Sequence, residues 1–112
     1  MAFNATLETT GIIGKITLSG ELDASTAPIF KTEVEKAAGA GVKRLVLLMN
    51  DLEYMASAGL RVLIFTKQKM GADADIYVVG AQEMVADTLE KTGYTQSVIM
   101  MDEYDAAEIE KD

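Results

Sequence analysis

The stretch LMNDLEYMASAGLRVLIF, residues 48–65, changes character twice along its length. Its first residues continue an apolar run that starts at Leu45, which is typical of a strand buried on both faces. The acidic segment 50–53 follows and predicts a turn. From Ser57 to about Met70 the apolar side chains recur at helical spacing. A buried strand followed at once by a helix is the repeating unit of α/β domains, so this stretch indicates the fold class.

The residues before this stretch predict a β-hairpin. Segments 3–9 and 12–18 alternate between apolar and polar side chains, and Thr10-Gly11 separates them. This pattern is typical of two antiparallel strands with one buried face. The second strand is expected to end in a loop formed by Gly20-Glu21-Leu22-Asp23.

A first helix is expected after this loop. Ser25 or Thr26 is the predicted N-cap, and Pro28 is tolerated in the first turn, where the N–H groups have no intrahelical partner. Gly39-Ala40-Gly41 is expected to end the helix. The predicted inward-facing residues, at helical spacing, are Ala27, Phe30, Val34, Ala37 and Ala38.

The chain after residue 70 predicts a further alternation of strands and helices. Strands separated by helices imply parallel crossovers, so we expect residues 1–112 to form one α/β domain: a mixed β-sheet with an N-terminal hairpin and about four α-helices packed against it. A turn is expected at 71–73, a buried strand at 76–79, a helix at 81–92 and an edge strand at 97–101. In the helix at 81–92, Val85, Thr88 and Leu89 are expected to face inward and Gly93 to end the helix. A last helix is expected to be capped by Asp102, to run to about Glu110, and to be anchored by Ala106 and Ile109.

The composition excludes several kinds of site. The chain has no Cys and no His, so it has no disulfide, no imidazole base and none of the usual transition-metal ligands. A net charge of −8 disfavours binding to a nucleic-acid backbone. The N-terminal residues MAFNATLETT lack the features of a signal peptide, and no apolar run approaches the ~20 residues that span a bilayer. We therefore expect a cytoplasmic protein without membrane insertion and without a cofactor.

Enzymatic interpretations of Ser57 find no support in the sequence. A hydrolase elbow needs Gly two residues before the nucleophile, where this chain has Met55. It also needs a base, but the chain lacks His, the usual one, and no Lys that could replace it lies near Ser57 in the sequence. No GxxxxGK[ST] or GxGxxG motif is present. Asp51 follows an apolar strand as in a receiver domain, but no acidic pair closes the first strand to hold Mg²⁺. We expect a protein without catalytic activity of its own.

Ser57 stands where the predicted second helix begins, which favours an N-cap. Its oxygen would accept a hydrogen bond from the N–H of Gly59 or Leu60 and contribute about 0.5–2 kcal/mol. The same position would hold the hydroxyl at the surface and at the positive end of the helix, where a phosphate is tolerated. Capping and phosphorylation are therefore compatible predictions.

Two features of this helix leave alternatives open. Gly59 lies in the first turn, where Gly costs about 1 kcal/mol relative to Ala. Either its bare backbone lets another protein approach Ser57, or it packs closely against the Gly20 loop. The helix is also apolar on more than one face. Its second face packs on another helix, or it forms a docking surface that Met55 and Leu60 extend.

Three segments together resemble the STAS family, and in particular the bacterial anti-sigma factor antagonists. They are GELD at 20–23, the apolar strand that ends in Asn50-Asp51-Leu52, and YMASAGLRVL at 54–63, and the resemblance covers nearly the whole chain. It implies a Ser at the start of the second helix that is phosphorylated by an anti-sigma factor, itself a Ser/Thr kinase of the histidine-kinase-like ATPase type. The unphosphorylated form would bind that anti-sigma factor and so free a sigma factor for transcription. Phosphorylation would abolish binding, and a phosphatase of the PP2C type would restore it.

The resemblance assigns the phosphorylated Ser to Ser57 and the Asp that lies beside it to Asp23. Many kinase-regulated members carry Asp before the acceptor Ser and a second Ser after it, where this chain has Ala56 and Ala58. Ser57 is therefore the one candidate acceptor in the turn. The expected partner-binding residues are Glu21, Asp23, Ser25, Thr26, Met55, Ala56, Ala58, Gly59, Leu60 and Arg61.

A phosphate at Ser57 would act through charge. It would add about −1.5 to −2 charge at pH 7, close to Asp23 and Glu21 if the two loops meet. Repulsion and desolvation would then shift the affinity for a partner. The alternative is a STAS-like scaffold or regulatory subunit of a transporter or sensory complex, in which Ser57 is only a structural helix cap.

Overall fold

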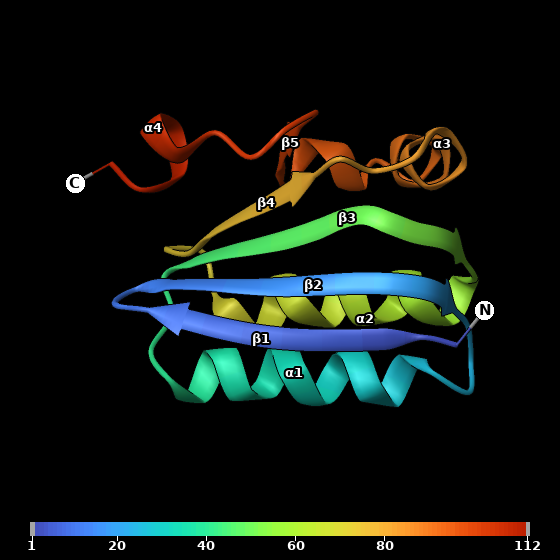
Figure 1. The fold of residues 1–112 in the computed structure, drawn as a ribbon, viewed down its shortest axis with the longest axis horizontal. Helices are drawn as coiled ribbons and strands as arrows, with labels where there is room; N and C mark the ends of the chain where they lie inside the picture. The colour runs from blue at the N-terminus through green and yellow to red at the C-terminus, as the bar shows by residue number, and fades with distance from the viewer. Residues whose placement is uncertain (1, 112) are drawn as a thin grey trace.

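The chain is organised around a five-stranded sheet with the strand order β1-β2-β3-β4-β5, in a computed structural model that describes residues 2–111. β1 pairs with β2 antiparallel, and the other three pairs are parallel. The predicted mixed sheet with an N-terminal hairpin is thus confirmed (Figure 1). The strands are β1 (Asn4–Thr10), β2 (Ile13–Leu22), β3 (Arg44–Met55), β4 (Asp75–Val79) and β5 (Ile99–Met101); the helices are α1 (Ala27–Gly39), α2 (Ser57–Met70), α3 (Glu83–Lys91), the 3₁₀ helix η1 (Tyr94–Gln96) and α4 (Ala106–Ile109).

The alternation of side chains along the strands divides the apolar residues between two faces of the sheet. On β3, Leu45 and Leu47 belong to the main core, to which α1, α2 and α3 contribute. Val46 points to the opposite face and lies in a smaller cluster. Ile109 of α4 closes this second cluster and is fully buried. By these two clusters α1 and α2 lie on one side of the sheet and α4 on the other.

β2 and β3 are longer than the sequence predicted. The expected loop at residues 20–23 and the expected turn at residues 50–53 are largely strand, with Gly20 paired to Leu52 and Leu22 paired to Met55. Both predictions were wrong because the backbones of the two parallel strands go on pairing through two register shifts, while the polar side chains of 50–53 are exposed. As a consequence, α1 and α2 start side by side at the end of the sheet where β2 and β3 stop (Figure 1).

The remaining boundaries follow the sequence closely, with differences near the C-terminus. α2 has the predicted bounds, and Gly93 after α3 has the left-handed backbone expected of a terminator, with φ 79°. The last helix is capped by Asp105, whose side chain accepts from the N–H of Glu108, and not by Asp102. Of its two predicted anchors Ile109 is buried, but Ala106 is exposed. Among residues 2–111 no helix combines the length and the hydropathy that crossing a bilayer requires.

Two predicted inward-facing residues are only half-buried. They are Ala38 near the end of α1 and Thr88 on α3, whose hydroxyl donates to the carbonyl oxygen of Met84. The other predicted inward residues of these helices are buried in the main core: Ala27, Phe30, Val34, Ala37, Val85 and Leu89.

Candidate functional site

The start of α2 has no side-chain cap. Ala56 is the N-cap residue, with the extended backbone angles φ −85° and ψ 173°, and Ser57 is the first residue of the helix. The prediction that Ser57 caps this helix was therefore wrong, because a capping side chain must come from the extended residue that precedes the helix. Ser57 is exposed, and its hydroxyl makes no hydrogen bond to any other residue in the range 2–111.

Backbone hydrogen bonds hold the start of α2 against the end of β2. The N–H of Ala56 donates to the carbonyl oxygen of Leu22 at 2.8 Å, and the carbonyl of Ala56 accepts from the N–H of Gly59 at 3.0 Å. The N–H groups of Ser57 and Ala58 have no acceptor within the described part of the chain. Among the described residues, the positive end of the helix therefore carries two N–H groups without an acceptor next to a hydroxyl without a partner.

Gly59 explains how α2 comes so close to the strands. It is buried, and a Cβ atom built on it would lie 2.7 Å from Cγ and Cδ2 of Leu22 and 2.9 Å from Cγ of Met55. No real side chain fits at those distances without a shift of its neighbours. Of the two explanations left open by the sequence, the structure favours close packing, and the contact is with Leu22, two residues after Gly20.

The turn before α1 is built around the Asp23 carboxylate. Its Oδ1 accepts hydrogen bonds from the Ser25 hydroxyl at 2.7 Å, the Ser25 N–H at 2.9 Å and the Thr26 N–H at 3.1 Å. The bond from the Ser25 hydroxyl is the main cause that lowers the pKa of Asp23, with the two backbone N–H groups adding to it against partial desolvation. Asp23 is therefore ionised at neutral pH.

Of the two residues predicted to cap α1, Thr26 occupies the N-cap position and Ser25 does not. Thr26 is the N-cap residue, but its side chain does not accept from a helix N–H. Its hydroxyl instead donates to the carbonyl oxygen of Glu21 at 3.0 Å and accepts from the N–H of Asp23 at 2.8 Å. Both side chains, Ser25 and Thr26, thus stabilise the turn that carries the carboxylate and not the helix that follows.

The structure brings Asp23 and Ser57 to the same end of the sheet. Leu22 pairs with Met55, so Asp23 follows the paired position by one residue and Ser57 by two. The sequence-predicted partner-binding residues divide by exposure: Glu21, Ser25 and Arg61 are exposed, Asp23, Thr26, Ala56, Ala58 and Leu60 are half-buried, and Met55 and Gly59 are buried.

A groove between α1 and α2 begins beside Ser57. It has a volume of about 390 Å³, and Ala58, the neighbour of Ser57, lines one end. Lys31 and Arg61 give it positive charge, and the Lys31 ammonium lies 4.7 Å from the centroid of the Phe65 ring. The second apolar face of α2 therefore packs in part on α1, as one of the two alternatives predicted. Sequence reasoning missed Lys31, because its place on the groove depends on how the two helices pack.

Among residues 2–111 no group of three or more Asp, Glu, His or Cys side chains is arranged to hold a metal ion. The arrangement is one of hydroxyl, carboxylate and free N–H groups at the surface, which suits modification and protein contact.

Comparisons with known proteins agree on the family. The family model of the STAS domain matches residues 4–107. No curated protein matched the chain. Among solved structures, an anti-sigma factor antagonist from Mycobacterium paratuberculosis is similar with a TM-score of 0.86 at 22% identity, covering 98% of this chain and 96% of that one.

Two further solved structures show the same likeness. A putative anti-sigma factor antagonist from Thermotoga maritima has a TM-score of 0.84 at 20% identity, covering 96% of this chain and 95% of that one. The anti-sigma factor antagonist SpoIIAA in its unphosphorylated form has a TM-score of 0.75 at 20% identity, covering 98% and 96%. At these identities the likeness is one of fold, and it extends over the whole domain. The chain belongs to the STAS domain family.

Proposed function

We propose that this STAS domain is an anti-sigma factor antagonist, a protein-binding switch without catalysis whose state is set by phosphorylation of Ser57. The observation that carries the proposal is the exposed Ser57 hydroxyl, unpartnered within residues 2–111, at the start of α2 beside the Asp23 turn. The similar fold of known antagonists supports it, and one of them, the Bacillus protein SpoIIAA, has been solved in unphosphorylated and phosphorylated forms.

In the unphosphorylated state, the surface around Ser57 binds the anti-sigma factor. Ser57 and the Asp23 turn form its polar part, and the groove between α1 and α2 forms its apolar part. Arg61 and Lys31 on this groove suit acidic groups of the partner. The partner is an ATPase of the histidine-kinase-like type that also phosphorylates Ser57, so binding withdraws it from its sigma factor.

Phosphorylation ends binding through charge and desolvation. The phosphate adds about −1.5 to −2 charge at pH 7, next to the turn whose carboxylate is already ionised. Burying this charge in an interface without a paired cation is costly. A loss of about 2.7 kcal/mol would lower the affinity about a hundredfold. In the free protein the unpaired N–H groups of Ser57 and Ala58 accommodate the phosphate, so the modified domain stays folded until a phosphatase of the PP2C type restores it.

Affinity measurements on two variants test this switch. A pull-down with the wild-type chain supplies the partner, and calorimetry gives the dissociation constants. Ser57→Ala should bind within about twofold of wild type, since the serine hydroxyl is free, whereas Ser57→Asp should bind about a hundredfold more weakly. Thr10→Asp adds the same charge at the opposite end of the hairpin and should leave the affinity unchanged. Equal affinities of wild type, Ser57→Ala and Ser57→Asp would contradict the proposal.

A scaffold or regulatory subunit of a transporter or sensory complex is the second candidate. Ala56 favours it, because many kinase-regulated relatives carry Asp at that position. In this case Ser57 would carry no phosphate in the cell. This alternative gave Ser57 the structural role of a helix cap. Ser57 does not have that role, because Ala56 occupies the cap position.

A further inference from the structure

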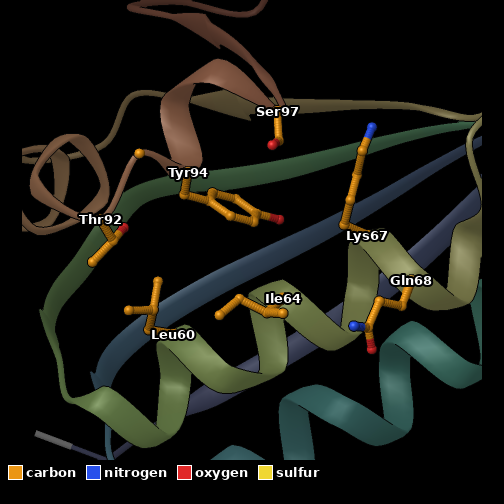
Figure 2. A pocket seen from close by; sticks show the side chains of 8 residues that line it. Leu60, Ile64, Lys67, Gln68, Thr92, Tyr94 and Ser97 are labelled. Carbon is orange, nitrogen blue, oxygen red and sulfur yellow. The ribbon is translucent and has the colours of Figure 1, made fainter.

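A second groove lies on the other side of α2, between this helix and η1 (Figure 2). Its volume is about 340 Å³, within the range of roughly 300–1,000 Å³ that is typical of small-molecule sites. The groove between α1 and α2 has none of its lining residues in common with this one. The lining residues are Leu60, Ile64, Lys67, Gln68, Thr92, Gly93, Tyr94 and Ser97.

The walls of this groove are apolar. Ile64 is 46% exposed, which is high for a large aliphatic side chain, and half-buried Leu60 lies one turn before it on the same side of α2. The ring of Tyr94 faces these two side chains from η1 (Figure 2). Its hydroxyl donates to the carbonyl oxygen of Leu63 at 2.8 Å. Tyr94 is buried, with 6% of its surface exposed, so its ring closes the back of the groove as an apolar wall. The hydrogen bond engages its polar end and fixes η1 to α2.

One rim of the groove is polar and positively charged. Figure 2 shows Lys67 and Ser97 on the same side of the Tyr94 ring. Within residues 2–111 the ammonium of Lys67 has no carboxylate partner, and the hydroxyl of Ser97 has no hydrogen-bond partner. Lys67 is also the one charged residue among those that line the groove, in a chain with 18 acidic and 10 basic residues. The groove thus combines apolar walls with an unpaired cation and a free hydroxyl at one edge.

We propose that this groove binds a small amphipathic anion, an apolar chain that ends in a carboxylate. The chain lies over Leu60, Ile64 and the Tyr94 ring, where it removes apolar surface from water. The carboxylate lies at Lys67 and accepts a hydrogen bond from Ser97. This inference does not rest on the function proposed above. It does place a ligand on α2 itself, since Leu60 and Ile64 follow Ser57 by three and seven residues and so lie on the same side of the helix.

Titration of the purified, isotope-labelled protein with decanoate tests the site, with decanol as an uncharged probe of equal chain length. Two-dimensional amide NMR should show saturable shifts at Leu60, Ile64, Gly93 and Tyr94. Ile64→Asp should weaken decanoate binding at least about tenfold. Lys67→Gln should weaken decanoate binding about two- to fivefold and leave decanol binding unchanged. Lys69→Gln removes an exposed lysine of the same helix outside the groove and should change neither.

Several results would overturn the proposal. Shifts that do not saturate, or that map to the groove between α1 and α2, would show that decanoate does not occupy this site. If decanol bound as tightly as decanoate, and Lys67→Gln bound decanoate as tightly as wild type, the carboxylate would not contribute to binding at Lys67. Thermal unfolding checks that Ile64→Asp is folded. If this variant is unfolded, the NMR shifts of the wild type and the affinity of Lys67→Gln for decanoate decide whether the groove is the binding site. Because no step uses the anti-sigma factor, a failure here is distinct from a failure of the Ser57 switch.

Discussion

The helices α1 and α2 start at the same end of the sheet but begin in opposite ways. Before α1, the Asp23 carboxylate accepts hydrogen bonds from the hydroxyl and N–H groups of Ser25 and from the N–H of Thr26. Before α2, Ala56 supplies no side-chain cap, and the Ser57 hydroxyl makes no bond within residues 2–111. Local hydrogen bonds thus order the start of α1, whereas packing on the strands orders the start of α2.

The difference shows how a surface can be rigid and still have free hydrogen-bonding groups. Gly59 packs on Leu22, and the N–H of Ala56 donates to the carbonyl of the same residue. These contacts fix the position of Ser57 without using its hydroxyl. At the start of α1, in contrast, the Ser25 hydroxyl is already engaged by Asp23. Two exposed serines that follow the same end of the sheet therefore differ in the availability of their hydroxyl groups.

The largest effect on stability is expected for a methyl group added where packing orders the helix start. Gly59→Ala should lower the free energy of unfolding by about 1–3 kcal/mol, because its Cβ would overlap Leu22 and Met55. Gly39→Ala is the matched control at the end of α1, where an added Cβ meets nothing within 4 Å, and it should be neutral or stabilising by up to about 1 kcal/mol. Chemical denaturation measures both, and equal effects would contradict the packing account.

A smaller change is expected when the missing cap is supplied. Ala56→Ser places a hydroxyl on a residue that already has the extended backbone of an N-cap. It should accept from a free N–H of the first turn and raise the free energy of unfolding by about 0.5–2 kcal/mol. Ala58→Ser adds the same hydroxyl inside the helix and should give no such gain. If Ala56→Ser is no more stable than wild type in chemical denaturation, the N–H groups at the start of α2 do not lack a hydrogen-bond acceptor, which would contradict this account.

The smallest effect is expected from removing the carboxylate before α1, and it should depend on pH. Asp23→Ala should lower the Tm at pH 7, because the hydrogen bonds to the ionised carboxylate are lost. The pKa of Asp23 is lowered in the folded state, so its contribution is present above the unfolded-state pKa of about 3.9. It disappears as the pH falls through the lower folded-state pKa.

Thermal unfolding of wild type and Asp23→Ala over a series of pH values checks this. The difference in Tm should be constant near neutral pH and should vanish in acid. Asp73→Ala, at an exposed position in the turn before β4, should leave the Tm unchanged at pH 7. A Tm difference for Asp23→Ala that persists in acid would mean that the carboxylate does not order the turn.

Much of this fold could be predicted from the sequence because its elements have local signals. The alternation of residues 3–9 and 12–18 predicts the hairpin, and the bounds of α2 follow from helical spacing after an apolar strand. α3 ends at Lys91, two residues before Gly93, and a glycine at this place predicts the left-handed backbone that follows a helix. Each of these signals lies within a few residues of the feature that it predicts.

The details of the site could not be predicted in this way, because they depend on contacts between distant segments. Residues 50–53 have the composition of a turn, yet they stay in β3 because β2 continues beside them. Ser57 is a residue type that often caps helices. The N-cap is nevertheless Ala56, whose extended backbone donates a hydrogen bond to Leu22, and the helix begins at Ser57. The sequence indicates the residues of the site, and the strand pairing decides which of them have free groups.

The central claim is that the fold leaves Ser57 open to phosphorylation while Ser25 is engaged. The most direct measurement is intact-mass analysis, with fragment mapping, of the purified protein after incubation with ATP and an extract of the cells that produce it. We predict a single phosphate on Ser57, none on Ser25, and none at all on the Ser57→Ala variant. A wild-type protein that gains no phosphate, or gains it only at another residue, would contradict the claim.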